Sequence, residues 1–233
     1  SPSGRPVRSS VYVPAPVGRT VDAVLFDMDG TLVDTEKLWF QAEASVMRRL
    51  GAGWTAADQE NLVGGSMPAA VAYMLAKSGA ERDPDEVAAW MIDSVLGLLA
   101  EGFDLMPGAA ELLAEVRAAG LPTGLVTSSS RLLADAVLGG IGGGFDVVVT
   151  ANDVDLFKPH PQPYLRAATA LGADPLRCAA IEDSPAGVAS ATAAGCAVVA
   201  VPSVLPIPPA PRRLVAESLK QVGLATLRDL VGR

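Results

Sequence analysis

The sequence predicts an α/β protein in which a parallel β-sheet core carries an inserted all-helical segment. Half of the 233 residues are hydrophobic and aromatic residues are few, which is typical of tightly packed α/β proteins. From Leu121 onward, short β-rich runs alternate with helical patterns, as expected for a parallel sheet covered on both faces. Residues 35–104 show helical spacing without a strand pattern, so the insertion separates the first strand from the second.

The elements can be placed in order along the chain. Residues 1–19 are rich in Ser, Pro, Gly and Arg and are predicted to form a flexible tail, with a candidate edge strand at 11–13. Residues 21–26 are almost entirely apolar and predict a buried first strand. In the insertion, apolar residues recur at helical spacing between glycine and proline breaks, which predicts helices at 36–50, 68–77 and 84–100.

The second part of the chain supplies the remaining strands and helices. Its strands are expected at 123–127, 147–150, 178–181, 197–201 and 215–218. Its helices are expected at 109–119, 131–138, 161–171, 186–194 and 224–231. We therefore divide the chain into a tail (1–19), an α/β core (20–34 and 105–233) and a helical cap (35–104).

Composition excludes several classes of function. Lys and Arg total 18 against 26 Asp and Glu, and the resulting charge of −8 argues against nucleic acid as a partner. Neither a membrane span nor a signal peptide is evident, so we expect a cytoplasmic monomer without membrane association. Cys178 and Cys196 lack CxxC spacing and are expected to be buried free thiols. The single histidine, His160, argues against a multi-histidine metal site and a Ser-His-Asp triad.

Two carboxylates follow the first strand directly. Asp27 and Asp29 are one residue apart, and the two-residue period of a strand end directs both to the same side. Two unit charges about 4 Å apart repel by roughly 4 kcal/mol at an effective dielectric constant of about 20. The pair therefore predicts a bound cation or a shared proton.

Polar residues also follow the other strands of the predicted sheet. Thr127, Ser128 and Ser129 follow the second strand, Lys158 comes after the third, and Glu182 and Asp183 end the fourth. Ligands of open parallel sheets bind at the carboxyl ends of the strands. We therefore expect acids, hydroxyls and a lysine to meet at one edge of the sheet.

Four segments carry a resemblance to a known family. They are Asp27-Met28-Asp29-Gly30-Thr31, then Thr127, then Lys158-Pro159-His160-Pro161, then Glu182-Asp183-Ser184 with Gly187. From Val21 onward the chain resembles the haloacid dehalogenase (HAD) superfamily of phosphohydrolases, in the branch with a helical cap after the first strand. Asp34-Thr35-Glu36 and the run from Lys158 to Tyr164 are similar to the β-phosphoglucomutase-like sugar phosphatases. The resemblance implies a HAD-like Rossmannoid core.

The resemblance also implies a reaction. Asp27 would attack phosphorus to give an aspartyl-phosphate that water hydrolyses, with Asp29 as the general acid and base. Mg²⁺ would be held by Asp27, the backbone carbonyl of Asp29, and Asp183. Glu182 would orient a metal-bound water or another ligand from outside the coordination shell.

The same resemblance implies the phosphate contacts. Lys158 would neutralise the nucleophile and a phosphoryl oxygen, and the Thr127 hydroxyl with the adjacent backbone at Ser128 would bind another. Each residue also has a purely structural interpretation. Thr127 and the following serines can cap a helix, and Glu182 and Asp183 can cap the helix at Pro185.

Specificity is expected to come from the cap. Trp39 and the loop residues Gly65, Ser66 and Met67 are candidate substrate contacts. In the alternative interpretation Trp39 packs in the cap interior, and the Gly64-Gly65 pair only ends a helix.

Two positions depart from the sugar phosphomutases of this branch, which have an arginine where this chain has Met67 and a histidine where it has Trp39. A second phosphate would therefore lose its bidentate partner, which favours hydrolysis of a small sugar or polyol monophosphate. A phosphomutase and a non-catalytic phospho-ligand binder remain the alternatives. A dehalogenase is disfavoured because Asp29 and the acidic pair are present.

Overall fold

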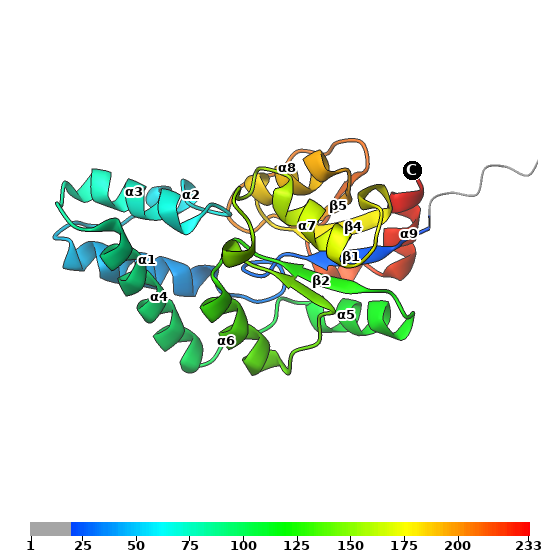
Figure 1. Cartoon of the computed structure of the whole chain (residues 1–233), viewed down its shortest axis with the longest axis horizontal. Coiled ribbons are helices and arrows are strands. Elements are labelled where there is room, and N and C mark those ends of the chain that lie inside the picture. Colours follow the sequence, from blue (N-terminus) through cyan, green and yellow to red (C-terminus); the bar gives the residue numbers. More distant parts are fainter. Residues whose placement is uncertain (1–19) are drawn as a thin grey trace, which may run out of the picture.

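The computed structural model describes residues 20–233, and the predicted tail and the candidate strand at 11–13 lie outside this range. Its sheet has six parallel strands in the order β3-β2-β1-β4-β5-β6 (Figure 1). The strands are β1 (Ala23–Phe26), β2 (Thr123–Val126), β3 (Val147–Val149), β4 (Cys178–Glu182), β5 (Ala197–Ala200) and β6 (Arg213–Val215). The predicted parallel sheet is therefore confirmed.

The first strand lies in the middle of the sheet, which explains its apolar sequence. All four residues of β1 are buried, and neighbouring residues face opposite sides of the sheet. Val24 and Phe26 join the core on one face, while Ala23 and Leu25 join the core on the other. The register pairs Phe26 with Leu125 of β2 and with Ile181 of β4, so these three strands end together.

Helices cover both faces of the sheet, as the alternation of strand and helix patterns predicts. The helices α7 (Gln162–Ala170) and α8 (Pro185–Ala194) pack on one face, where Tyr164 is fully buried. On the other face lie α5 (Ala109–Ala118), α6 (Arg131–Ile141) and α9 (Leu224–Gly232) (Figure 1). Short 3₁₀ turns occur at Ala151–Asp153, Pro175–Arg177 and Leu219–Gln221.

The insertion between β1 and β2 contains four helices that extend away from the sheet (Figure 1). They are α1 (Glu36–Arg49), α2 (Ala56–Glu60), α3 (Met67–Ser78) and α4 (Pro84–Ala100). The two backbone segments that lead into and out of this insertion lie side by side and are joined by hydrogen bonds. The N–H of Asp34 donates to the carbonyl of Asp104 at 2.8 Å, and that of Met106 donates to Leu32 at 2.9 Å.

The structure differs from the sequence prediction at one strand, which is misplaced, and at one helix, which is missing from the prediction. The last strand is β6 at Arg213–Val215 instead of 215–218, because Ser218 caps the following 3₁₀ turn and ends the extended backbone. The helix α2 was not predicted, since five residues are too few to show a helical period. Its capping box is visible in the sequence: the side chain of Thr55 accepts from the N–H of Asp58, and that of Asp58 accepts from the N–H of Thr55.

Two composition-based expectations can be compared with the described residues. Cys178 and Cys196 are buried free thiols, as predicted. Within residues 20–233, no helix has both the length and the apolar character needed to cross a bilayer.

Candidate active site

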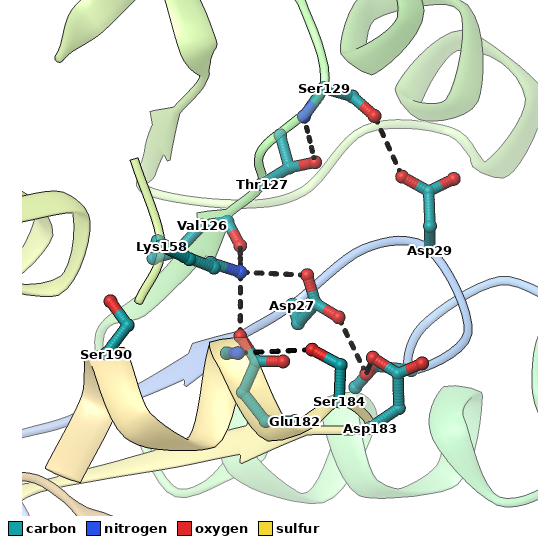
Figure 2. Close-up of polar contacts among 12 residues, drawn as sticks. Asp27, Asp29, Val126, Thr127, Ser129, Lys158, Glu182, Asp183, Ser184 and Ser190 are labelled. Carbon is teal, nitrogen blue, oxygen red and sulfur yellow. Dashed lines mark hydrogen bonds and ion pairs between the residues drawn. The ribbon is translucent and has the colours of Figure 1, made fainter. Parts of the chain in front are cut away.

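A buried lysine joins the ends of three neighbouring strands. The Nζ of Lys158 lies 2.9 Å from Asp27 Oδ1, 2.7 Å from Glu182 Oε1 and 2.8 Å from the carbonyl oxygen of Val126 (Figure 2). These partners follow or end β1, β4 and β2. Since an ammonium has three N–H groups, this set satisfies all of them. This is the edge of the sheet at which the sequence analysis expects a lysine to meet acids and hydroxyls.

Burial and charge act in opposite directions on this ion pair. Burial alone would raise the pKa of Asp27, but the charge of Lys158 and hydrogen bonds to the carboxylate hold the pKa below its usual value. Burial would lower the pKa of Lys158, but the charges of Asp27 and Glu182 raise it. At neutral pH the site therefore holds an ionised carboxylate beside a protonated lysine.

Glu182 is the second carboxylate partner of Lys158. Its Oε1 also accepts a hydrogen bond of 2.5 Å from the hydroxyl of Tyr164. Burial, with the charge of Asp27, raises the pKa of Glu182 to about 7. A side chain at Gly187 would collide with the carboxylate of Glu182, which explains why this position of α8 has no side chain. Ser184 is the N-cap of α8 and accepts from the N–H of Gly187, so neither Glu182 nor Asp183 serves as that cap.

Three carboxylates form a buried acidic cluster that could hold a cation. Asp27, Glu182 and Asp183 each offer an oxygen, and these oxygens lie within 4.8 Å of one another. The hydroxyl of Thr31 contacts two of them, at 3.0 Å from Asp27 Oδ2 and 3.2 Å from Asp183 Oδ1. Burial and the charge of Asp27 raise the pKa of Asp183 well above its usual value.

The acidic cluster fits a hard divalent cation by its chemistry. Three carboxyl groups face a single ammonium, and within residues 20–233 the buried Oε2 of Glu182 has no hydrogen-bond partner. Carboxylate oxygens are the ligands that Mg²⁺, Mn²⁺ and Ca²⁺ prefer. The clustered side chains include the two predicted carboxylate ligands, Asp27 and Asp183, and add Glu182, which was expected outside the coordination shell.

The side chain of Asp29 is held by three donors. Its Oδ1 accepts from the hydroxyl of Thr35 at 2.7 Å and from the indole N–H of Trp39 at 2.9 Å. Its Oδ2 accepts from the hydroxyl of Ser129 at 2.9 Å (Figure 2). Burial raises the pKa of Asp29; the Thr35 and Trp39 hydrogen bonds partly oppose this, and the charge of Asp27 adds to it.

The contact of Trp39 with Asp29 was missed at the level of sequence. Trp39 was considered as a substrate contact or as part of the cap interior, and it lines the cavity and packs against the core as well. A signal was present: Thr35 precedes α1 and Trp39 is four residues later, so both side chains lie on one face of that helix. Their shared partner, Asp29, lies outside the helix, so the contact itself can be seen only in the folded structure.

Hydroxyl groups follow β2 at the same edge of the sheet. The side chain of Thr127 accepts from the N–H of Ser129 at 3.0 Å, and within residues 20–233 the buried hydroxyl of Ser128 has no partner. Ser130 occupies the N-cap position of α6 but makes no side-chain capping bond. Capping therefore does not account for Thr127 or Ser128, and both line the adjacent cavity.

A cavity of about 120 Å³ lies between this edge of the sheet and the helical insertion. It brings together most of the residues that the sequence singled out, while Glu182 lies outside its lining. The predicted site residues that line it are Asp27, Asp29, Trp39, Gly65, Ser66, Met67, Thr127, Ser128, Lys158 and Asp183. His160 is absent from this lining; its Nδ1 accepts from the N–H of Gln162 at 3.1 Å, a local structural contact.

The insertion touches the core beside the cavity through Gly64. This residue has a φ of +73°, which favours glycine, and a side chain there would collide with Ser184. Two residues later, Ser66 caps α3 by accepting from the N–H of Ala69 at 3.3 Å. The Gly64-Gly65-Ser66 loop thus ends one turn and begins a helix, and it also forms part of the cavity wall.

A further buried carboxyl, Glu43 of α1, lines the cavity from the insertion side. It was not singled out from the sequence, where it reads as a polar residue of a helix. Glu43 is only 4% exposed. Burial raises the pKa of Glu43 from 4.5 to about 7, although the nearby indole of Trp54 lowers it in part.

This shift makes stability depend on pH. The pKa of Glu43 is higher in the folded chain than in the unfolded one. Its contribution to the free energy of unfolding is therefore fully present below about pH 4.5 and is lost as pH rises to about 7. We expect Glu43→Gln to remove a decline of about 3 kcal/mol in the free energy of unfolding across this window. Urea titrations at a series of pH values measure it, with Glu86→Gln at an exposed position of α4 as the control. An equally steep decline in Glu43→Gln contradicts the assignment.

Comparison with known proteins agrees with this geometry. The family model of haloacid dehalogenase-like hydrolases matches residues 21–195. Hexitol phosphatase B of Escherichia coli K12 is 34% identical over 224 residues, covering 92% of this chain and 98% of that protein.

Solved structures agree as well. CbbY from Rhodobacter sphaeroides, in complex with phosphate, has a TM-score of 0.81 at 28% identity and covers 89% of this chain and 99% of its own. β-Phosphoglucomutase from Clostridium difficile has a TM-score of 0.80 at 25% identity, covering 91% and 97%. The resemblance seen in the sequence is confirmed, and the chain belongs to the haloacid dehalogenase-like hydrolase family.

Proposed function

We propose that this protein is a Mg²⁺-dependent phosphatase that hydrolyses a small sugar or polyol phosphate through an aspartyl-phosphate intermediate. The observation that carries the proposal is the ionised Asp27, held 2.9 Å from Lys158 beside a buried acidic cluster and facing a cavity. Similarity to a hexitol phosphatase supports the class of substrate.

In the proposed first step, an oxygen of Asp27 forms a bond to phosphorus while the bond from phosphorus to the leaving alcohol oxygen breaks. Lys158 neutralises charge on Asp27 and on a phosphoryl oxygen as the phosphoryl group arrives. Mg²⁺, held by Asp27, Asp183 and the backbone carbonyl of Asp29, would neutralise charge on the transferring phosphoryl group. Glu182 would hold Lys158 in place through their ion pair and would orient a ligand of the ion from outside the coordination shell.

Asp29 is proposed to carry the proton. In the first step it donates a proton to the leaving alcohol, and in the second it takes one from the water that hydrolyses the aspartyl-phosphate. The raised pKa of Asp29, caused mainly by burial, suits this role, since it makes the carboxyl group a better proton acceptor than an ordinary aspartate and keeps a proton available to higher pH. Thr35, Trp39 and Ser129 orient the group.

Thr127 and Ser128 are proposed to bind a phosphoryl oxygen. Both line the cavity, and the hydroxyl of Ser128 is buried without a partner in the described part of the chain. A phosphoryl oxygen would supply that partner, and the nearby start of α6 favours negative charge.

Phosphate release in the presence of Mg²⁺ or EDTA tests the proposal. We expect hydrolysis of p-nitrophenyl phosphate and of one or more sugar or hexitol monophosphates with Mg²⁺, and loss of turnover with EDTA that added Mg²⁺ restores. Formation of an isomerised sugar phosphate without free phosphate would assign a phosphomutase instead. Tight binding of a phosphorylated ligand without turnover of any substrate would assign a non-catalytic binder.

A further inference from the structure

The cavity wall supplied by the helical insertion is largely apolar. Its apolar members are Trp39, Leu62, Val63, Met67, Ala70 and Ile92, and its polar members besides Glu43 are Glu36, Gln59 and Ser66. Glu43 lies in the same wall. A carboxyl group in apolar surroundings is unfavourable unless its oxygens have hydrogen-bond partners.

Glu43 lacks such partners inside the described part of the chain. Its residue is 4% exposed, and the buried Oε1 has no hydrogen-bond partner among residues 20–233. The indole N–H of Trp54 lies near enough to lower the pKa of Glu43, but it also forms no hydrogen bond of normal geometry in that range. Two carboxylate oxygens accept about four hydrogen bonds, so a single N–H leaves most of this capacity unused.

The distribution of charge around the cavity limits what can lie against Glu43. Among the lining residues Lys158 is the only cation, and it is already bonded to Asp27 and Glu182. The other charged lining residues are all acids: Asp27, Asp29, Glu36, Glu43 and Asp183. A second phosphate or a carboxylate on the substrate would lose its water at the insertion side without gaining a cationic partner.

We propose that Glu43 selects the substrate by hydrogen bonding to a hydroxyl group of an uncharged polyol or sugar leaving group, and that the cavity rejects phosphate esters with a second anionic group. The inference rests on the proposed phosphatase function and adds a specificity-determining residue to it. Burial raises the pKa of Glu43 to about 7, so near neutral pH the carboxyl group both donates and accepts hydrogen bonds, as a hydroxyl does. Neither protonation state compensates a second anion.

The test compares substrates that differ only in the leaving group. For Glu43→Leu, which keeps most of the side-chain volume but can neither donate nor accept a hydrogen bond, we expect kcat/KM to fall roughly 10- to 100-fold on a hexitol monophosphate, because the hydrogen bond to the leaving group is lost. On p-nitrophenyl phosphate, whose leaving group has no hydroxyl to offer, we expect a change within about 3-fold. The matched control is Glu86→Leu, the same chemical change at an exposed position of α4 away from the cavity, which should leave the ratio of the two activities unchanged.

A measurement of the variant's stability distinguishes a role of Glu43 in substrate recognition from a purely structural role. The loss on the hexitol phosphate should occur in a Glu43→Leu protein that is at least as stable as the wild type above about pH 7, because an apolar side chain then replaces a buried carboxylate. Wild-type enzyme should also prefer the hexitol monophosphate to a hexose bisphosphate by at least about 10-fold in kcat/KM.

Two results would overturn the inference while leaving the phosphatase function intact. One is an unchanged ratio of hexitol phosphate to p-nitrophenyl phosphate activity in Glu43→Leu. The other is wild-type turnover of the bisphosphate as fast as of the monophosphate. Absence of hydrolysis of every ester by wild-type enzyme would instead reject the proposed function itself.

Discussion

Replacing Asp27 with asparagine is expected to lower Mg²⁺-dependent phosphate release by at least about 10³-fold, because the amide cannot attack phosphorus as a carboxylate does. Among the described residues, the nearest carboxyl groups are engaged elsewhere: Glu182 lies outside the cavity lining, Asp29 is bonded to Thr35, Trp39 and Ser129, and Asp183 accepts from Thr31 and Ser203. The loss should therefore appear in kcat for every substrate, whatever its leaving group.

The same variant should remain folded. The amide at position 27 can turn its one oxygen toward Lys158, while Thr31 keeps Asp183 as an acceptor and Glu182 keeps its ion pair with the lysine. Circular dichroism and urea titration check this. The control is Asp93→Asn, the same chemical change at an exposed position of α4, which should retain activity. Asp27→Asn activity within about 10-fold of wild type would exclude Asp27 as the nucleophile.

Lys158→Met is expected to damage both stability and activity. Its ammonium lies 2.9 Å from Asp27 and 2.7 Å from Glu182 and is the only cation paired with them in residues 20–233, and both carboxyl groups are buried. Removing one partner of a buried ion pair costs about 3–5 kcal/mol, because the remaining charge is left uncompensated. Loss of charge neutralisation at the phosphoryl group should lower kcat by a further 10²–10³-fold, roughly the effect of removing one oxyanion-stabilising donor.

A double variant separates these two effects. In Lys158→Met with Glu182→Gln, one uncompensated carboxylate has been removed, so part of the stability should return while activity stays low. The deficit of the single variant should also shrink as pH falls, since loss of the Lys158 charge raises the pKa of Glu182 further and lets the orphaned carboxyl group become neutral. Urea titration and kcat measurements on the three proteins give both quantities. Stability of Lys158→Met equal to wild type at neutral pH contradicts the burial argument.

The sequence predicts the core of the site because that part depends on local rules. Asp27 follows an apolar strand, and parallel strands in register bring Val126 and Glu182 beside it. Likewise, Lys158 follows the third strand, so the topology of the sheet directs it to the same edge. These positions follow from strand ends and need no knowledge of side-chain packing.

Other features depend on how the insertion packs and could not be predicted from periodicity. The bond from Trp39 to Asp29 and the position of Glu43 on the cavity wall both follow from the placement of α1 against the sheet. The strand β6 was misplaced because it is short and half-buried at the edge, with Arg213 in its first position. Local apolar patterns carry little information at such an edge.

The central claim is that Asp27 becomes phosphorylated during turnover, and trapping the intermediate tests it directly. Enzyme mixed with substrate carrying a radiolabelled phosphoryl group, and quenched with acid during the first turnover, should carry label on the peptide that contains Asp27. Hydroxylamine, which cleaves acyl phosphates, should release the label, and Asp27→Asn should acquire none. Rapid release of phosphate with no labelled protein, or stable label on a hydroxyl of Thr127 or Ser129, would contradict the account.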